Sequence, residues 1–205
     1  MTTTASLSPV VKYHGLGHRH LEPHRLLMRP LLNGATLGGL AMQADDFASL
    51  AREYDSLLRG AQNLKPHEFL LACAKLLPRI YAAGISLPNA EPDDTEPAPS
   101  AHSPALPSLG RFDVYSEVFD PFVHEDPVMS ALSSDLSEIY SDLVGPLQDF
   151  DVGRVANAIR SWRFNICGHC GEHLVDALRA IHRAIFDHMP DDYVAAVDGK
   201  KSPPI

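Results

Sequence analysis

The chain has 205 residues, and its 17 Lys and Arg against 26 Asp and Glu give a formal net charge of −9. Because phosphate contacts require clustered Lys and Arg, this acidic balance argues against nucleic-acid binding. The hydrophobic fraction of 45% is ordinary for a globular protein, and the absence of any run of about 18 apolar residues excludes a membrane-spanning helix.

Residues 1–42 are predicted to form a disordered or loosely packed N-terminal extension. Prolines and glycines interrupt this stretch, and no amphipathic period is visible in it. We interpret it as a tail, or as the product of an upstream start codon with Met28 or Met42 as the true beginning. The alternative is a metal-binding arm, since the stretch holds four histidines: His14, His18, His20 and His24.

Residues 43–187 are predicted to form a single helical domain. Apolar spacing predicts a helix from Asp45-Asp46 to Gly60, then a second from Pro66 that Pro78 kinks or splits. Residues 86–110 carry six prolines and four acids with no Lys or Arg, so we expect a Pro-rich acidic linker. The tail, 188–205, should fray.

Three further helices are predicted after the linker. A short one covers Phe112 to Phe119, a second runs from Leu132 to Leu143 and stops at Gly145-Pro146, and the longest spans about 154–183. No long alternation of β-branched residues suggests a sheet. The predicted fold class is therefore all-α, a helical bundle of about five core helices.

The last helix contains the most informative pattern in the chain. At 100° per residue, His173 lies within an apolar stripe and His169 lies at its edge. The only tryptophan, Trp162, lies on the same stripe and is predicted to be a core anchor. A histidine inside a core is costly unless its ring nitrogens are paired or liganded, so both histidines are candidate site residues.

Cysteines near these histidines suggest two chemistries that the context argues against. Cys167-Gly168-His169-Cys170 equals the redox motif of disulfide isomerases, but that motif follows a strand and opens a helix, whereas this one is predicted mid-helix. Cys-x-x-Cys with the histidines also resembles a zinc half-site, but one helix would keep the four side chains from converging. With Cys73, the three cysteines are too few for a disulfide-stapled scaffold.

Three acids could complete a site with the histidines. Asp135, Glu138 and Asp142 lie on one side of the preceding helix, and carboxylates and imidazoles from facing helices bind divalent metals in helical bundles. A metal would then be held by His169, His173, Asp135 and Glu138. The alternative is structural pairing of these acids with arginines of the last helix, namely Arg160, Arg163 and Arg179, which we favour.

Gly168 and Gly171 require their own explanation, because each costs about 1 kcal/mol in a helix interior relative to alanine. Close contact between helices, room for a ligand beside the histidines, and a break in the helix are all consistent with the sequence. A break in the helix would remove the basis of the predicted apolar stripe, because the stripe assumes one continuous helix.

Several segments resemble a bacterial family, the domain of unknown function numbered 5063. Residues 134–143 (SDLSEIYSDL) resemble its DLxDIYxDL segment, and residues 162–164, 169–173 and 176–182 (WRF, HCGEH, DALRAIH) resemble its W-x-F, H-W-G-x-H and ALxALH signature. Residues 115–121 also resemble the Y-x-x-F-x-P stretch of this family. Cys170 departs from the family's tryptophan, and Glu138 replaces its aspartate. The resemblance, over about 45–187, implies a helical fold and gives no indication of an activity.

The function predicted from the sequence is that of a non-enzymatic, cytoplasmic protein-interaction or regulatory module, with an unknown protein partner or a second copy of the chain. No cofactor is expected. The alternative is a metal- or small-ligand-binding bundle, including a hydrolytic one, in which a divalent metal would be the cofactor. The residues to watch in either case are His169, His173, Asp135, Glu138, Asp142, Trp162 and Arg163.

Overall fold

The computed structural model describes residues 37–189 except 94, 97, 119 and 125, with side chains described from residue 42 onward. Most of the predicted extension 1–42 and tail 188–205 lies outside this part of the chain. Within it, the first helix begins at Leu37, before the predicted start at Asp45-Asp46, and a helical turn includes His188. None of its helices combines the length and the apolar character needed to cross a membrane.

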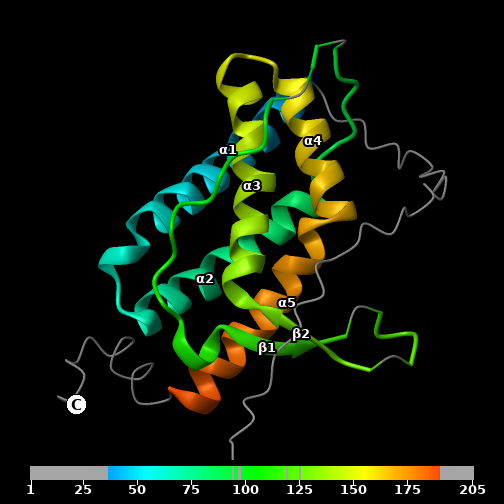
Figure 1. The fold of residues 1–205 in the computed structure, drawn as a ribbon. Coiled ribbons are helices and arrows are strands. Elements are labelled where there is room, and N and C mark those ends of the chain that lie inside the picture. Colours follow the sequence, from blue (N-terminus) through cyan, green and yellow to red (C-terminus); the bar gives the residue numbers. More distant parts are fainter. Residues whose placement is uncertain (1–36, 94, 97, 119, 125, 190–205) are drawn as a thin grey trace, which may run out of the picture. The chain divides into compact units, whose positions relative to one another are not determined.

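The described chain is mostly helical, which confirms the predicted all-α bundle of about five core helices. Helix α3 contacts α1, α4 and α5, while α2 packs on α1, α4 and α5 (Figure 1). The helices are α1 (Leu37–Gly60), α2 (Pro66–Ile85), α3 (Leu132–Asp151), α4 (Val155–Gly168) and α5 (Cys170–Arg183). Short 3-10 turns cover Ala61–Asn63 and Gly110–Phe112, and a π-helical turn covers Ala184–His188.

Aromatic and aliphatic side chains from all five helices form one core. Trp162 is fully buried and packs at ring-centroid distances of 5.0 Å from Phe47 and 5.7 Å from Phe150. Its indole N–H donates a 2.8 Å hydrogen bond to the Leu143 carbonyl, so the polar atom of this large side chain is satisfied. Phe47 is on α1, Leu143 and Phe150 are on α3, and Trp162 is on α4.

Pro78 was predicted to kink or split its helix and Gly145-Pro146 to end the next one, and the structure shows neither a split nor an end at these prolines. Helix α2 runs through Pro78, and α3 continues past Pro146 to Asp151. Proline at position 146 supplies no N–H to the carbonyl four residues earlier, that of Asp142. The side-chain amide of Asn165 on α4 donates a 3.1 Å hydrogen bond to this carbonyl. A neighbouring helix thus provides the partner that proline removes.

The helix predicted over 112–119 is wrong, because this segment forms one strand of a β-hairpin. Strand β1 (Val114–Glu117) pairs antiparallel with β2 (Val128–Ala131), and Tyr115 lies opposite Ser130. Alternation over four residues is too short to distinguish from a helical pattern in sequence. The hairpin projects from the helices on the right of Figure 1.

The long helix predicted over 154–183 is broken into α4 and α5 at His169, whose φ of −149° and ψ of −81° are not helical. Of the three explanations for the glycines, the break therefore holds. The predicted stripe is still buried at Ile159, Trp162, Ile166, Cys170 and Ala177, because both helices turn that side toward the core.

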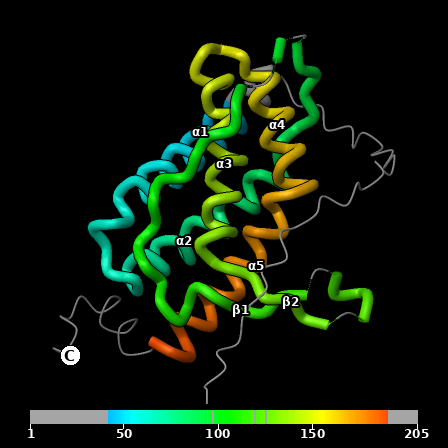
Figure 2. Tube along the Cα trace, in the orientation of Figure 1, coloured from blue at the N-terminus to red at the C-terminus, as the bar shows by residue number. Residues whose placement is uncertain are grey.

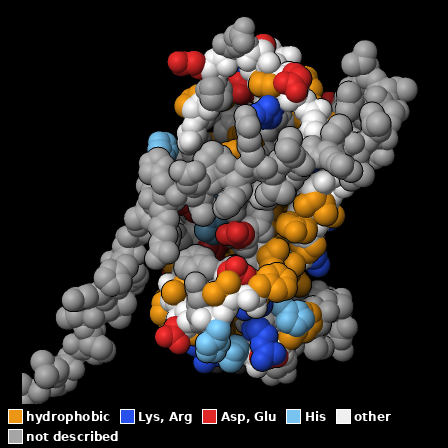
Figure 3. All heavy atoms as spheres, turned by 90° about the vertical axis from the view of Figure 1, so that its right-hand side faces the viewer, with side chains coloured by type: hydrophobic (Ala, Val, Ile, Leu, Met, Phe, Trp, Pro, Cys, Tyr) orange, Lys and Arg blue, Asp and Glu red, His pale blue; other side chains and the backbone are white. Residues whose placement is uncertain are grey.

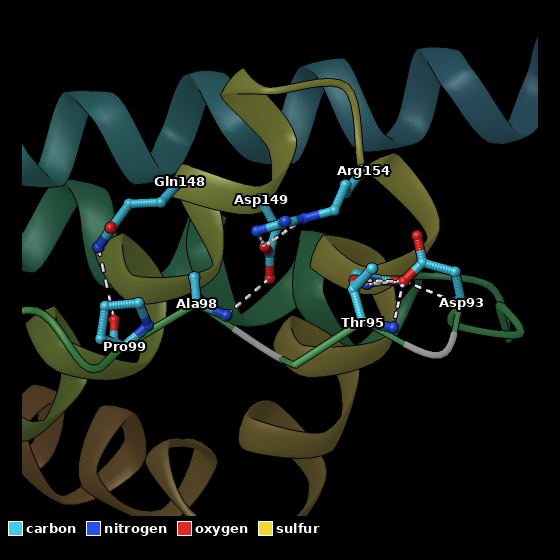
Figure 4. Close-up of polar contacts among 8 residues, drawn as sticks. Asp93, Thr95, Ala98, Pro99, Gln148, Asp149 and Arg154 are labelled. Atoms are coloured by element: carbon cyan, nitrogen blue, oxygen red, sulfur yellow. Dashed lines mark hydrogen bonds and ion pairs between the residues drawn. The ribbon is translucent and has the colours of Figure 1, made fainter.

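The Pro-rich segment 86–110 is irregular, as predicted, but it is anchored along α3 (Figure 2). The buried Asp149 carboxylate accepts hydrogen bonds from the Arg154 guanidinium and, at 3.1 Å, from the Ala98 N–H (Figure 4). The Asn157 amide donates a 2.7 Å hydrogen bond to Asp93. Side chains of α3 and α4 therefore hold a segment whose composition alone suggests a free linker.

Candidate functional site

Two histidine–aspartate pairs join α5 and its N-terminal boundary to α3. His169 Nδ1 lies 2.7 Å from Asp142 Oδ2, and His173 Nδ1 lies 2.9 Å from Asp135 Oδ1. The two acids are seven residues apart on α3, which brings their side chains to one side of the helix. The two histidines are four apart, with the helix beginning between them. Each pair therefore bridges two elements that are adjacent in the bundle.

The paired imidazoles lie next to each other and differ in exposure. Their ring centroids are 4.9 Å apart with an interplanar angle of 81°, an edge-to-face arrangement. The His169 side chain is 49% exposed and that of His173 is 28% exposed. Both rings therefore reach the protein surface while their partners, Asp142 and Asp135, are mostly covered.

The carboxylates raise the pKa of both histidines. The hydrogen bond with Asp142 raises the pKa of His169 above its usual value, and the hydrogen bond with Asp135 does the same for His173. Partial burial opposes the rise in both rings, and the negative charge of Glu138 adds to it. The site therefore favours the imidazolium form more than water does.

Only one nitrogen of each ring is used by the described residues. Each Nδ1 is engaged by an aspartate, and within the described part of the chain neither Nε2 has a hydrogen-bond partner. A carboxylate on one nitrogen fixes the tautomer and orientation of the ring and makes the other nitrogen a better ligand. The chemistry open to this site therefore resides at the two Nε2 atoms.

Asp135 also connects the helices to the hairpin, through residues that were not predicted as site residues. The Tyr115 hydroxyl on β1 lies 2.6 Å from Asp135 Oδ2 and 2.9 Å from Glu117 Oε2. One hydroxyl proton cannot be donated fully to two carboxylates, so the arrangement favours a second proton on one of the two acids. Burial, with smaller contributions from Asp135 and Asp176, raises the pKa of Glu117.

The signal for Tyr115 and Glu117 was weak in the sequence. Their alternation with exposed Val114 and Ser116 is what a strand shows, but four residues do not establish a strand. The link from Asp135 to Tyr115 spans 20 residues, and only the pairing of β1 with β2, which leads directly into α3, brings these side chains together.

Glu138, the third predicted acid, is exposed on α3 and forms no ion pair with another described residue. It lies near enough to both histidines for its charge to influence them. The described residues contain no group of three or more His, Cys, Asp or Glu side chains arranged to hold a metal ion. A metal at the two imidazoles would need a further ligand, from a moved Glu138 side chain or from another molecule.

The predicted arginine partners do not pair with the three acids. Arg163 donates to the Leu87 carbonyl, and Arg179 contacts Asp176 and the Ser116 carbonyl, both at 3.3 Å. Arg160 is exposed and forms no ion pair among the described residues. Arg160 and Arg163 lie on α4, before the break, and the two histidines at and after the break contact Asp142 and Asp135 instead.

The cysteines around the junction differ in environment. Cys170 is buried, and burial together with the charge of Asp142 raises the pKa of its thiol. Burial also raises the pKa of Cys73, whereas Cys167 is exposed. A thiol with a raised pKa is a poor nucleophile, so the environment of Cys170 is the opposite of a redox cysteine's.

Comparisons with known proteins address the fold and the family. None of the curated proteins matches the chain. The crystal structure of protein BF1032 from Bacteroides fragilis is similar, with a TM-score of 0.57 and 21% sequence identity over 69% of this chain and 90% of that chain. At this identity the likeness concerns the fold. The family model for the domain of unknown function DUF5063 matches residues 40–187, most of the chain. The chain therefore belongs to the DUF5063 family.

Proposed function

We propose that this chain is a non-enzymatic protein-interaction module whose contacting arm is the β1–β2 hairpin. The observation that carries the proposal is the apolar surface of this arm. Phe122 is 97% exposed at the connection between the strands, and Met129 on β2 is 64% exposed. Val114, Val123 and Val128 are exposed on the same hairpin. Val114 and Met129 lie on one face of the hairpin and Val128 lies on the other. Exposed apolar side chains gathered on a projecting segment are typical of interaction surfaces.

The polar network of the candidate site would position this arm. An isolated two-stranded hairpin is only marginally stable in water, so it depends on its attachment to the helices. The Asp113 carbonyl accepts a 2.7 Å hydrogen bond from the Leu132 N–H, and its carboxylate accepts a 2.8 Å bond from the Ser133 N–H. Tyr115 adds the buried bond to Asp135, which His173 in turn contacts. The His173–Asp135 pair thus supports the base of the arm.

Site-specific photo-crosslinking tests this function. A benzophenone amino acid replaces Phe122 in one variant and Phe164, an exposed aromatic residue on α4, in the control. Both are expressed in cells that naturally contain the chain. A discrete adduct from position 122 that is absent from position 164, and that is lost on Met129→Ser, supports the arm. No adduct, or the same adducts from both positions, refutes it. An adduct of two copies identifies the partner as this chain.

A second candidate function, binding of a divalent cation, is favoured by one specific observation. Both histidines have Nδ1 on a carboxylate and Nε2 open, which is the arrangement that metal-binding histidines show. Glu138 beside them contributes negative charge. Zn²⁺ titration of untagged protein by calorimetry tests this function, with His173→Gln as the probe and His182→Gln on the exposed side of α5 as the control. Equal binding by both variants, or none by the wild type, contradicts it.

A further inference from the structure

A second surface feature lies at the other side of Tyr115, between β1 and the end of α5. A cavity of about 410 Å³ opens there, and Arg111, Phe112 and Tyr115 line it from the hairpin side. Arg179 and Arg183 of α5 and His188 of the π-helical turn line it from the helix side. This volume lies in the range typical of small-molecule sites. Figure 3 shows Lys or Arg side chains and His side chains close together at the lower end of the molecule, with Asp or Glu side chains beside them.

The lining is basic although the chain has a net charge of −9. Three guanidinium groups and an imidazole line the cavity, and no Asp or Glu is among the described residues that do so. Arg179 and Arg183 have acidic partners, Asp176 at 3.3 Å and Asp187 at 2.8 Å, but neither acid lines the cavity. Arg111 forms no ion pair among the described residues. Its N–H groups are therefore available to an incoming anion.

An aromatic layer and an irregular helix shape one wall of this cavity. The Arg111 guanidinium lies 4.8 Å from the centroid of the Phe112 ring, and this ring lies 5.9 Å from the His188 ring. The π-helical turn Ala184–His188 follows α5 directly and carries His188 to this position. Such turns are rare and are frequent at functional sites. The cavity thus offers an apolar surface beside its cationic groups.

We propose that this cavity binds a small organic phosphate, with the phosphate group at the guanidinium groups of Arg111, Arg179 and Arg183 and an apolar or aromatic portion against Phe112. Several guanidiniums around one cavity suit a dianion better than a monoanion, because each planar group can donate two parallel hydrogen bonds to phosphate oxygens. Neither the exposed tip of the hairpin nor the His–Asp pairs form this site, although Val114 and Tyr115 of β1 also line it.

Calorimetric titration of the full chain at low salt provides the test, with phenyl phosphate as the probe. Benzoate carries the same ring with one negative charge, and inorganic phosphate carries no ring. We expect phenyl phosphate to bind at least about tenfold more tightly than either of them. Arg111→Gln should weaken phenyl phosphate binding by about tenfold, the effect of losing one charge-assisted interaction. The binding should also weaken as salt is added.

The matched control is Arg160→Gln, which removes an exposed arginine of α4 outside the cavity. Binding unchanged by this substitution and weakened by Arg111→Gln supports the site, provided that urea unfolding shows both variants to be folded. Absence of phenyl phosphate binding overturns the proposal, as does equal weakening by both substitutions, which would mean only a general charge effect. Benzoate binding as tight as that of phenyl phosphate would refute the phosphate assignment.

Discussion

Gly171→Ala should destabilise the protein through a backbone clash at the α4–α5 junction. A Cβ atom at residue 171 would lie 2.1 Å from the carbonyl oxygen of Ile166, a distance that Cβ atoms in proteins essentially never show. Gly168, three residues earlier, offers the matched control, because a Cβ there would meet nothing within 4 Å. The same chemical change is thus forbidden at one glycine and free at the other.

The expected magnitude follows from two opposing effects. Replacing a helical glycine by alanine ordinarily stabilises by up to about 1 kcal/mol. Overpacking costs about 1–3 kcal/mol, and a rigid main-chain oxygen as the obstacle favours the upper end of that range. We therefore expect Gly171→Ala to lower the free energy of unfolding by about 2 kcal/mol, and Gly168→Ala to leave it unchanged or to raise it by up to about 1 kcal/mol.

Urea unfolding followed by the fluorescence of Trp162, the only tryptophan, measures this difference. Since the relaxation would move α5 relative to α3, the pKa of His173 in the Gly171→Ala variant should also fall toward its usual value of 6.5, measured by NMR. Equal stability of the two alanine variants would refute the proposed close approach of Gly171 to α4.

Three further outcomes are expected. Because the folded-state pKa values of His169 and His173 are raised, the stability that their pairs contribute should be complete below pH 6.5 and decrease as the pH rises through the raised values. Urea unfolding should show that the free energy of unfolding decreases less over this pH range in the His169→Gln/His173→Gln variant. The same pH profile in the variant and the wild type would contradict this. Asn165→Ala should lower the free energy of unfolding by about 1 kcal/mol. The loss should be smaller in a Pro146→Ala background, because alanine at position 146 supplies an N–H to the Asp142 carbonyl. Additive effects in the double-mutant cycle would exclude this coupling. In the native protein at pH 8, a thiol reagent should modify Cys167 and spare both buried cysteines; rapid modification of all three would show that the core opens.

Helical periodicity was sufficient to predict the bundle, because each core helix carries a long apolar stripe. The same rule identified His169, His173 and the acids of α3 as candidate site residues, although we predicted that the acids would form salt bridges with arginines. Which side chains meet the acids depends on how α4 and α5 pack against α3, and the two helices are separated by one non-helical residue, His169. Two glycines near this residue made a break in the helix conceivable. The apolar spacing in the sequence continues across the break, however, so it does not indicate that the helix ends there.

The helix past Pro146 and the hairpin were mispredicted for a different reason, since each depends on a distant partner. Pro146 is tolerated because Asn165 satisfies the carbonyl that it leaves without an N–H. Strand β1 exists because β2 pairs with it across a connection of ten residues, 118–127, and because Asp135 anchors Tyr115. Local sequence rules treat each segment as if it were isolated in water, whereas these segments form hydrogen bonds with other helices and strands.

Protonation at the His–Asp pairs changes less of the structure than the raised pKa values alone suggest. A neutral imidazole retains one N–H, and a carboxylate beside Nδ1 keeps that proton on Nδ1. Each pair therefore persists above the pKa as a weaker hydrogen bond, and Asp135 continues to hold both His173 and Tyr115. What changes is Nε2, which is a donor in the imidazolium form and a lone pair in the neutral form. Each pair is thus kept as a hydrogen bond on both sides of the histidine pKa, while the two Nε2 atoms change from donors to acceptors.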